Sequence, residues 1–89
     1  MKGRYLEITF RKGNAIAAYL YLPRPEGAKS VRTVDHGGGI LVDHQADGAP
    51  IGIEIASPNP ATIGQVNAVL LALGLPAADG QELVPLIAA

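Results

Sequence analysis

Residues 40–55, which read ILVDHQADGAPIGIEI, decide the fold class of this chain. The Asp-Gly dipeptide near the centre favours a two-residue hairpin turn, and alternating apolar residues flank it on both sides. In the second run, the isoleucines at 51, 53 and 55 share one face of a strand. The segment therefore predicts an antiparallel hairpin with one buried face.

Strand patterns also precede this hairpin. Residues 5–10 alternate between apolar and polar, residues 15–22 are apolar throughout, and residues 30–34 alternate weakly. Glycine, proline and asparagine separate these segments, as turns require. The chain is thus predicted to be an α+β protein, with an antiparallel β-meander of four to five strands over residues 5–56.

The pattern changes to helical spacing after the hairpin. Apolar residues recur every three to four positions, which predicts one main helix over residues 60–73, packed on one face of the sheet. Its start has two interpretations. Either Asn59 caps the helix with a proline at the first position, or Thr62 caps it with Gln65 completing a capping box. Gly74 is suited to end it.

A second short helix is predicted further along the chain. Asp79 and Glu82 have the spacing of a capping box, and Pro85 would then break or kink the helix within two turns. We interpret residues 1–89 as a single domain, in which a helical tail at 60–89 follows the meander.

Composition limits the core of this domain. The chain has 89 residues, of which 48% are hydrophobic, but only one Phe, three Tyr, no Trp and no Cys. A chain of this size buries roughly 60–65% of its unfolded surface, and neither disulfides nor zinc–thiolate sites can reinforce it. Because self-association is a remaining source of buried area, we expect a homodimer.

The charge balance bears on partners and location. Seven basic and eight acidic residues give a net charge of −1, which argues against nucleic-acid binding through a basic face. No apolar run reaches the ~18–20 residues of a membrane span. Charged residues at 7, 11 and 12 interrupt any leader-like apolar stretch. We therefore expect a cytoplasmic protein without a membrane or nucleic-acid partner.

The hairpin contains the one acidic pair with a defined geometry. A two-residue loop would make Asp43 and Glu54 diagonal neighbours on one sheet face, roughly 7–8 Å apart between Cα atoms. Such a pair could bind a hard cation or share a proton. Alternatively, the face is solvated or pairs with Arg32. His44 falls on the opposite face, so a joint His/Asp/Glu metal site is not expected, and no cofactor or catalytic residue is assigned.

The same hairpin resembles a bacterial family described as domain of unknown function 2283. The resemblance rests on Val42-Asp43, Asp47-Gly48 and residues 51–55, together with Tyr19-Leu20-Tyr21-Leu22, and covers residues 5–57. Ile16 and His44 depart from the family pattern, which has an acid and an aromatic residue there. The resemblance implies a small antiparallel sheet with no assigned activity, and an antitoxin-like role beside small toxin-like proteins.

Two functional hypotheses follow. The leading one is a non-enzymatic protein-interaction module, because aliphatic residues exceed what one small domain must bury. It would be homodimeric, and one form of the hypothesis pairs it with a toxin-like partner. The alternative is a small metal-dependent enzyme or ligand binder that uses Asp43 and Glu54. The expected interface residues of the first hypothesis are Tyr19, Tyr21, Leu70, Leu71 and Leu75.

Overall fold

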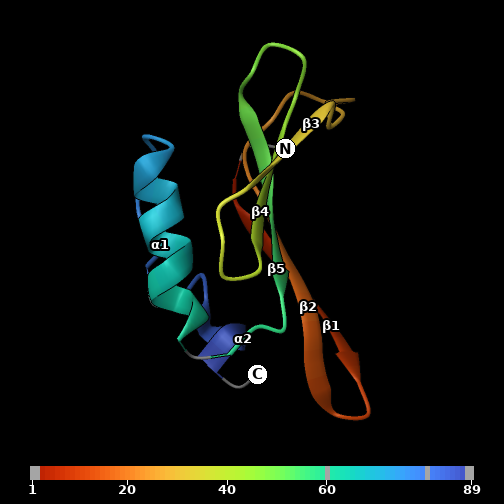
Figure 1. Cartoon of the computed structure of the whole chain (residues 1–89), viewed down its shortest axis with the longest axis vertical. Helices are drawn as coiled ribbons and strands as arrows, with labels where there is room; N and C mark the ends of the chain where they lie inside the picture. Colours follow the sequence, from red (N-terminus) through yellow and green to blue (C-terminus); the bar gives the residue numbers. More distant parts are fainter. Residues whose placement is uncertain (1–2, 60, 80, 88–89) are drawn as a thin grey trace.

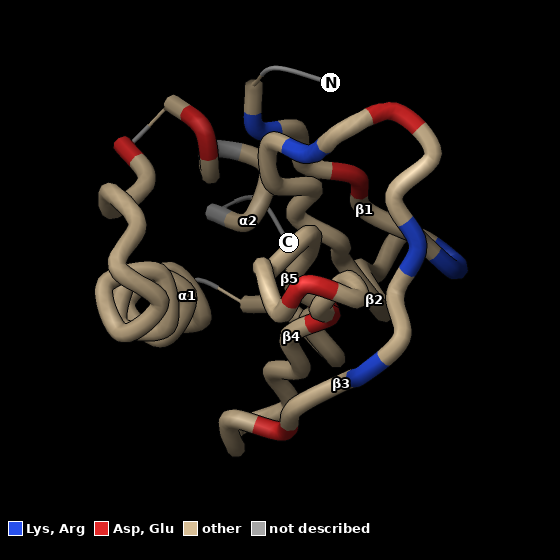
Figure 2. Tube along the Cα trace, turned by 90° about the horizontal axis from the view of Figure 1, so that it is seen from above, with Lys and Arg blue, Asp and Glu red and all other residues tan. Residues whose placement is uncertain are grey.

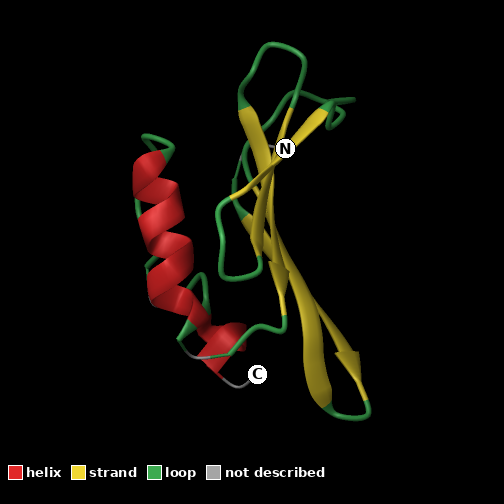
Figure 3. Cartoon of the chain, viewed as in Figure 1, coloured by secondary structure: helices red, strands yellow, loops and turns green. Residues whose placement is uncertain are grey.

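The computed structural model of the chain describes residues 3–59, 61–79 and 81–87. Five strands form one antiparallel sheet in the order β1-β2-β5-β4-β3, and one main helix lies along one side of it (Figures 1 and 3). This confirms the predicted α+β class and sheet. The elements are β1 (Tyr5–Arg11), β2 (Asn14–Tyr21), β3 (Arg32–Asp35), β4 (Ile40–His44), β5 (Pro50–Ala56), α1 (Thr62–Ala72) and α2 (Val84–Ile87).

The sheet consists of two consecutive-strand units. β1 pairs with β2, and β3, β4 and β5 pair in sequence, whereas β2 and β3, which a continuous meander would place side by side, are not neighbours in the sheet. The two units join where β2 lies antiparallel to β5. β1 and β3 therefore form the two edges of the sheet, and the proline-containing segment at 22–31 crosses from one unit to the other.

The β1–β2 hairpin turns at Lys12 and Gly13, whose φ angles are 51° and 80°. Two consecutive residues with positive φ are typical of the tight turn that matches the twist of paired strands. Ile16 is an extra residue on β2, because Thr9 pairs with Ala17 while Phe10 pairs with Ala15.

The hairpin of residues 40–55 differs from the prediction in its loop. The amide of Gln45 donates to the carbonyl of Ala49, so the loop has three residues rather than two, with Gly48 at φ 91°. A bulge then shifts the register between Asp43 and His44. The extra loop residue and the bulge cancel, so the predicted pairing of Asp43 with Gly52 is present.

Asn59 and Thr62 organise the start of α1 together. The Asn59 side-chain oxygen accepts the amide of Ala61 at 2.9 Å, and the Thr62 hydroxyl accepts the amide of Asn59 at 3.0 Å. These bonds stabilise the turn that precedes α1, which begins at Thr62, whereas Ala61, the residue that flanks the helix, makes no side-chain cap bond. The predicted Thr62 and Gln65 capping box is not present, and position 60 lies outside the described residues.

The end of α1 follows the prediction. Gly74 has φ 76° and its amide donates to the carbonyl of Leu71, while the amide of Leu75 donates to the carbonyl of Leu70. This is the bonding that a left-handed glycine provides at a helix C-terminus.

The tail after Gly74 folds back onto the sheet. Asp79 accepts the amides of Gln81 and Glu82, and Glu82 accepts the amide of Asp79, so the predicted capping box forms. Pro85 lies within the first turn of α2, where a missing amide is tolerated, rather than ending the helix. Arg4 pairs with Glu82 at 2.8 Å and fixes the tail to the start of β1.

The core lies between the sheet and the helices. One face of the sheet supplies alternating aliphatic residues, and α1 and the tail cover that face (Figure 1). No helix in the described ranges is long and apolar enough to cross a membrane. The buried core residues are Ala18, Leu20, Leu22, Ile40, Val42, Ile53, Ile55, Val66, Val69, Leu70, Ala78, Leu83 and Leu86.

Candidate functional site

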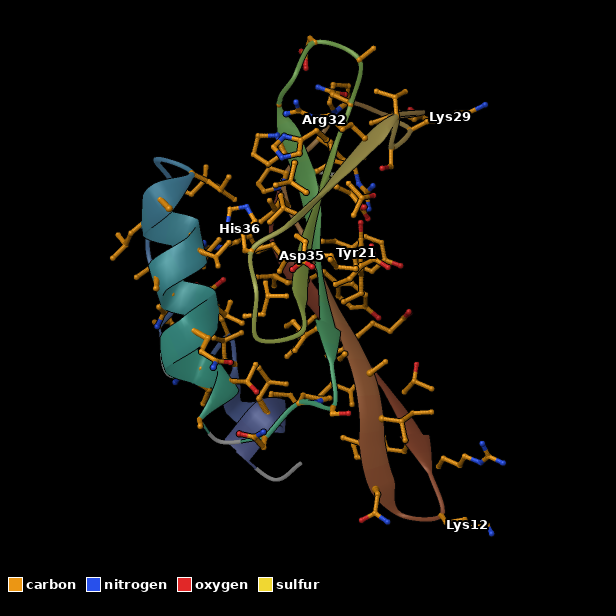
Figure 4. All side chains as sticks on the ribbon, viewed as in Figure 1. Lys12, Tyr21, Lys29, Arg32, Asp35 and His36 are labelled. Carbon is orange, nitrogen blue, oxygen red and sulfur yellow. The ribbon has the colours of Figure 1, made fainter. Side chains whose placement is uncertain are left out.

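In the described part of the chain, no helix lies over the other face of the sheet, which we call the open face. Strand pairing aligns its side chains in rows that cross the sheet. In one row, Glu7 pairs with Tyr19, Tyr19 with Glu54, and Glu54 with Leu41. Figure 4 shows Tyr21, from the adjacent row, on the side of the sheet away from α1. The open face is therefore acidic and aromatic where the covered face is aliphatic.

Asp43 is the best-fixed polar residue of the open face. It is only 8% exposed, and its two carboxylate oxygens accept different hydroxyl groups. The Thr33 hydroxyl donates to Oδ1 at 2.6 Å, and the Tyr19 hydroxyl donates to Oδ2 at 2.9 Å. Burying a carboxylate is costly unless it is hydrogen-bonded, and these two bonds provide that compensation.

Gly52 makes the contact between Tyr19 and Asp43 possible. It lies on β5 between Tyr21 and Asp43 in the register of the sheet. A Cβ atom at Gly52 would overlap the Tyr19 hydroxyl and ring. The tyrosine thus crosses β5 through the space that the glycine leaves open, which is a known use of glycine inside strands.

Burial and neighbouring carboxylates alter the proton affinity of two groups. Desolvation, the negative charge of Asp43 and a hydrogen bond with Asp43 together raise the pKa of Glu54 above its ordinary value. Desolvation and then the hydrogen bond to Asp43 also raise the pKa of the Tyr19 phenol. Glu54 therefore holds a proton at a higher pH than an isolated glutamate does.

A shallow groove of about 270 Å³ opens beside Glu54 on this face. The described residues that line it include two glutamates and no lysine or arginine. Asp43 and Glu54 lie on the paired strands β4 and β5, and Figure 2 shows charged positions on the strands and loops but none on α1. The groove is therefore acidic on one side and small or apolar on the other. Its side-chain lining comes mainly from Glu7, Thr9, Ala17, Tyr19, Leu41 and Glu54.

Aromatic rings border the carboxylates. The ring of Tyr21 lies 4.6 Å from that of Tyr19 and 5.6 Å from that of Tyr5, measured between centroids. The Arg24 guanidinium lies over the Tyr21 ring at 4.8 Å from its centroid. The open face thus already accommodates one guanidinium by stacking.

The predicted acidic pair is present, but its neighbours differ from those expected. Asp43 and Glu54 do lie together on the open face. Thr33, not Arg32, lies beside Asp43, because Arg32 pairs with His44. Successive residues of a strand point to opposite faces, so Arg32 falls on the covered face. His44 is buried on that face as predicted, and its Nδ1 lies 2.9 Å from the carbonyl of Gly48.

The predicted interface residues do not form one surface. Tyr19 and Tyr21 lie half-buried on the open face, whereas Leu71 is 62% exposed on the helix at the other side of the sheet. Leu70 was wrongly assigned, because it is fully buried in the domain's own core. Leu75 also packs against that core. Helical spacing does not separate Leu70 from Leu71 without knowing how the helix is rotated.

Two site residues were missed by sequence reasoning. Thr33 reaches Asp43 through the β3–β4 pairing, and Glu7 lines the groove through the β1–β2 pairing. The alternation of residues 5–10 already places Glu7 on the face opposite Leu6 and Ile8, so the sequence pattern could have predicted that Glu7 lies on the open face. No comparable signal existed for the β2–β5 pairing, which brings Tyr19 to Asp43 across 24 residues of sequence.

The described residues contain no group of three or more His, Asp or Glu side chains able to hold a metal ion. Two carboxyl groups supply fewer ligands than Ca²⁺ usually takes from a protein. Both oxygens of Asp43 also accept hydroxyl groups. The arrangement suits proton sharing better than metal binding, and the metal hypothesis stays a prediction.

Compared with protein-family models, with curated proteins and with solved structures, the chain has no match. The resemblance to domain of unknown function 2283 therefore stays a prediction. Function has to be argued from the geometry of the open face.

Proposed function

We propose that the protein is a non-enzymatic interaction module that binds a basic segment of a partner protein through its open face. The observation that carries this proposal is the position of Glu54. It lies at the wall of the groove and beside Asp43, and both burial and that neighbour raise its pKa. A positively charged group in the groove would stabilise the ionised form of Glu54, which burial and Asp43 disfavour.

The chemistry of the groove favours a lysine or arginine side chain. Glu7 and Glu54 line it and supply acceptor oxygens for a guanidinium or ammonium group. The tyrosines beside it offer ring faces and edges to the same cation. The stacking of Arg24 on Tyr21 shows that such a contact fits this face.

The size of the groove favours a side chain over a whole small molecule. Pockets that enclose drug-sized ligands usually have volumes of ~300–1,000 Å³. The groove has about 270 Å³ and is open to solvent along the sheet. We infer that it holds one long side chain, while the rest of a partner segment lies across the neighbouring strands.

Binding can be tested with an acetylated peptide that alternates arginine and serine. Its matched control has citrulline, which is neutral and of similar shape, at every arginine position. We expect the arginine peptide to bind and to shift the amide resonances of β2 and β5. Glu7→Gln and Glu54→Gln should each weaken binding by up to about fivefold.

Glu26→Gln is the matched variant, because it removes one acidic charge from the exposed loop at 22–31. It should leave the affinity unchanged. Equal binding of the citrulline peptide, or equal weakening by Glu26→Gln, would contradict a specific site on the open face.

The proposal also fixes the pH dependence of binding. A bound cation favours ionised Glu54, so binding releases a proton wherever Glu54 is protonated in the free protein. Affinity should rise with pH through a range above the ordinary glutamate pKa. Glu54→Gln should remove this dependence, which titration calorimetry at several pH values would detect.

Only the sequence bears on which kind of protein the partner is. The resemblance to a bacterial family supports a small toxin-like protein as the partner, and the absence of cysteine fits a cytoplasmic location. Co-expression with the protein encoded next to it, followed by purification of a complex that Glu54→Gln disrupts, would test this partner.

A further inference from the structure

The two edges of the sheet differ in how open they are to another strand. β3 has four residues, whereas β1 has seven and, among the described strands, pairs only with β2. β1 contains no proline, and the bulge in its hairpin adds its extra residue to β2. Short strands, prolines and bulges are common ways to block an edge, and β1 uses none of them on its outer side.

Apolar side chains are exposed at the same edge. Phe10 is 55% exposed, although it continues the alternation of Leu6 and Ile8, which pack against the core. Its cross-strand neighbour is only an alanine, Ala15. The β1–β2 hairpin projects beyond the rest of the sheet, away from both helices, as Lys12 at its tip shows (Figure 4). Phe10 therefore lacks cover on its outer side.

Symmetry limits how two β1 strands can pair. Directly opposite residues of an antiparallel pair point to the same face, so residues of odd number must meet residues of odd number. Among the symmetric registers of two β1 strands, those centred on Glu7, Ile8 or Thr9 pair five or more residues of each strand. The first places Glu7 opposite its own copy, which is unfavourable. The second places Glu7 opposite Thr9.

The register centred on Thr9 is complementary throughout. It places Glu7 of each copy opposite Arg11 of the other, so two opposite-charge pairs form by symmetry. It also places Phe10 opposite Ile8 of the other copy, which covers the exposed ring with an aliphatic side chain. Aromatic and β-branched pairs of this kind stabilise antiparallel strands.

We propose that two copies of this chain pair antiparallel through β1, with the two-fold axis at Thr9. The two five-stranded sheets then form one continuous sheet. Because this axis is perpendicular to the sheet, both α1 helices lie on one side and both open faces on the other. Glu7 takes part both in this pairing and in the lining of the groove, whereas Glu54 belongs to the groove and lies outside β1, so Glu54→Gln should weaken peptide binding without changing self-association.

Single-cysteine variants test the register directly, because the chain has no cysteine of its own. Thr9→Cys places two thiols at the axis, where a short bismaleimide should link the two copies. Glu7→Cys is the matched control: in this register its two thiols lie four residue positions apart along the strands, about 13 Å. Stronger crosslinking of Glu7→Cys than of Thr9→Cys, or none of either, would overturn the proposal.

Charge exchange provides a second test that needs no crosslinker. Glu7→Arg and Arg11→Glu should each weaken self-association by roughly 2- to 30-fold, because each change replaces two attractive pairs. The double variant restores opposite charges and should recover the original association in sedimentation velocity. A double variant no stronger than the single variants, or a monomeric starting protein at high concentration, would disprove this pairing.

Discussion

The covered and open faces of the sheet are stabilised in different ways. On the covered face, aliphatic side chains such as Leu20 and Ile53 pack against α1 and are almost completely buried. On the open face, the most buried side chain is a carboxylate, and hydroxyl groups from two other strands fix it. The stability of the covered face therefore depends on how well side-chain volume fills the core, whereas that of the open face depends on hydrogen bonds and on the protonation of its carboxyl groups.

The two faces should differ most in how much stability is lost when a large side chain is shortened. Ile53→Ala should lower the free energy of unfolding by about 2–5 kcal/mol, because Ile53 is fully buried and the cavity would be only partly filled. Leu41→Ala, on the open face, should cost about 1 kcal/mol. Urea denaturation of both variants measures this difference. Equal losses would mean that the open face is as tightly packed as the covered one.

A smaller effect is expected from added volume on the open face. Gly52→Ala should cost about 1–3 kcal/mol, because its methyl group displaces Tyr19 and weakens the bond to Asp43. The cost should largely disappear in the background of Tyr19→Ala, since the two residues are in contact.

The same substitution at Gly64 is the control for Gly52→Ala. Gly64 is an exposed residue of α1, and a Cβ atom added there would have no atom of the described residues within 4 Å beyond its own helix turn. Gly64→Ala should stabilise the protein by up to about 1 kcal/mol. A destabilisation by Gly52→Ala that persists unchanged without the Tyr19 ring would contradict the assigned contact.

The smallest effect concerns protonation. Because the pKa of Glu54 is raised in the folded protein, folding is accompanied by proton uptake between the ordinary and the raised pKa. The contribution of Glu54 to stability therefore decreases as pH rises through this range. Glu54→Gln should raise the melting temperature at neutral pH and change it little below pH ~4.

Thermal unfolding of the wild type, Glu54→Gln and Glu26→Gln at both pH values tests this prediction. Glu26→Gln removes the same charge from the exposed loop, away from Asp43. A similar gain in both variants at neutral pH would assign the effect to net charge, and would contradict the coupling between Glu54 and Asp43.

Local patterns explain most of the fold that could be predicted. The hairpin of residues 40–55, the glycine at the end of α1 and the capping box at Asp79 all depend on residues close in sequence. The registers within hairpins followed for the same reason. Asp43 and Glu54 could therefore be assigned to one face before their surroundings were known.

Contacts between distant segments could not be predicted in the same way. Tyr19 reaches Asp43 only because β2 lies beside β5, and no local pattern specifies which strand of one unit meets the other. Arg4 reaches Glu82 across 78 residues of sequence. The rotation of α1, which buries Leu70 and exposes Leu71, is likewise decided by the sheet against which the helix packs.

The three-residue loop at 46–48 and the bulge in β5 have a consequence for insertions and deletions. The loop and the bulge each shift the register by one residue, in opposite senses. A sequence one residue shorter in this hairpin can keep Asp43 beside Gly52 in two ways: the loop shortens to two residues and the bulge stays, or the loop keeps three residues and the bulge is lost. We expect both solutions among relatives, so a relative one residue shorter here should be aligned with a single gap, placed either at the loop or at the bulge.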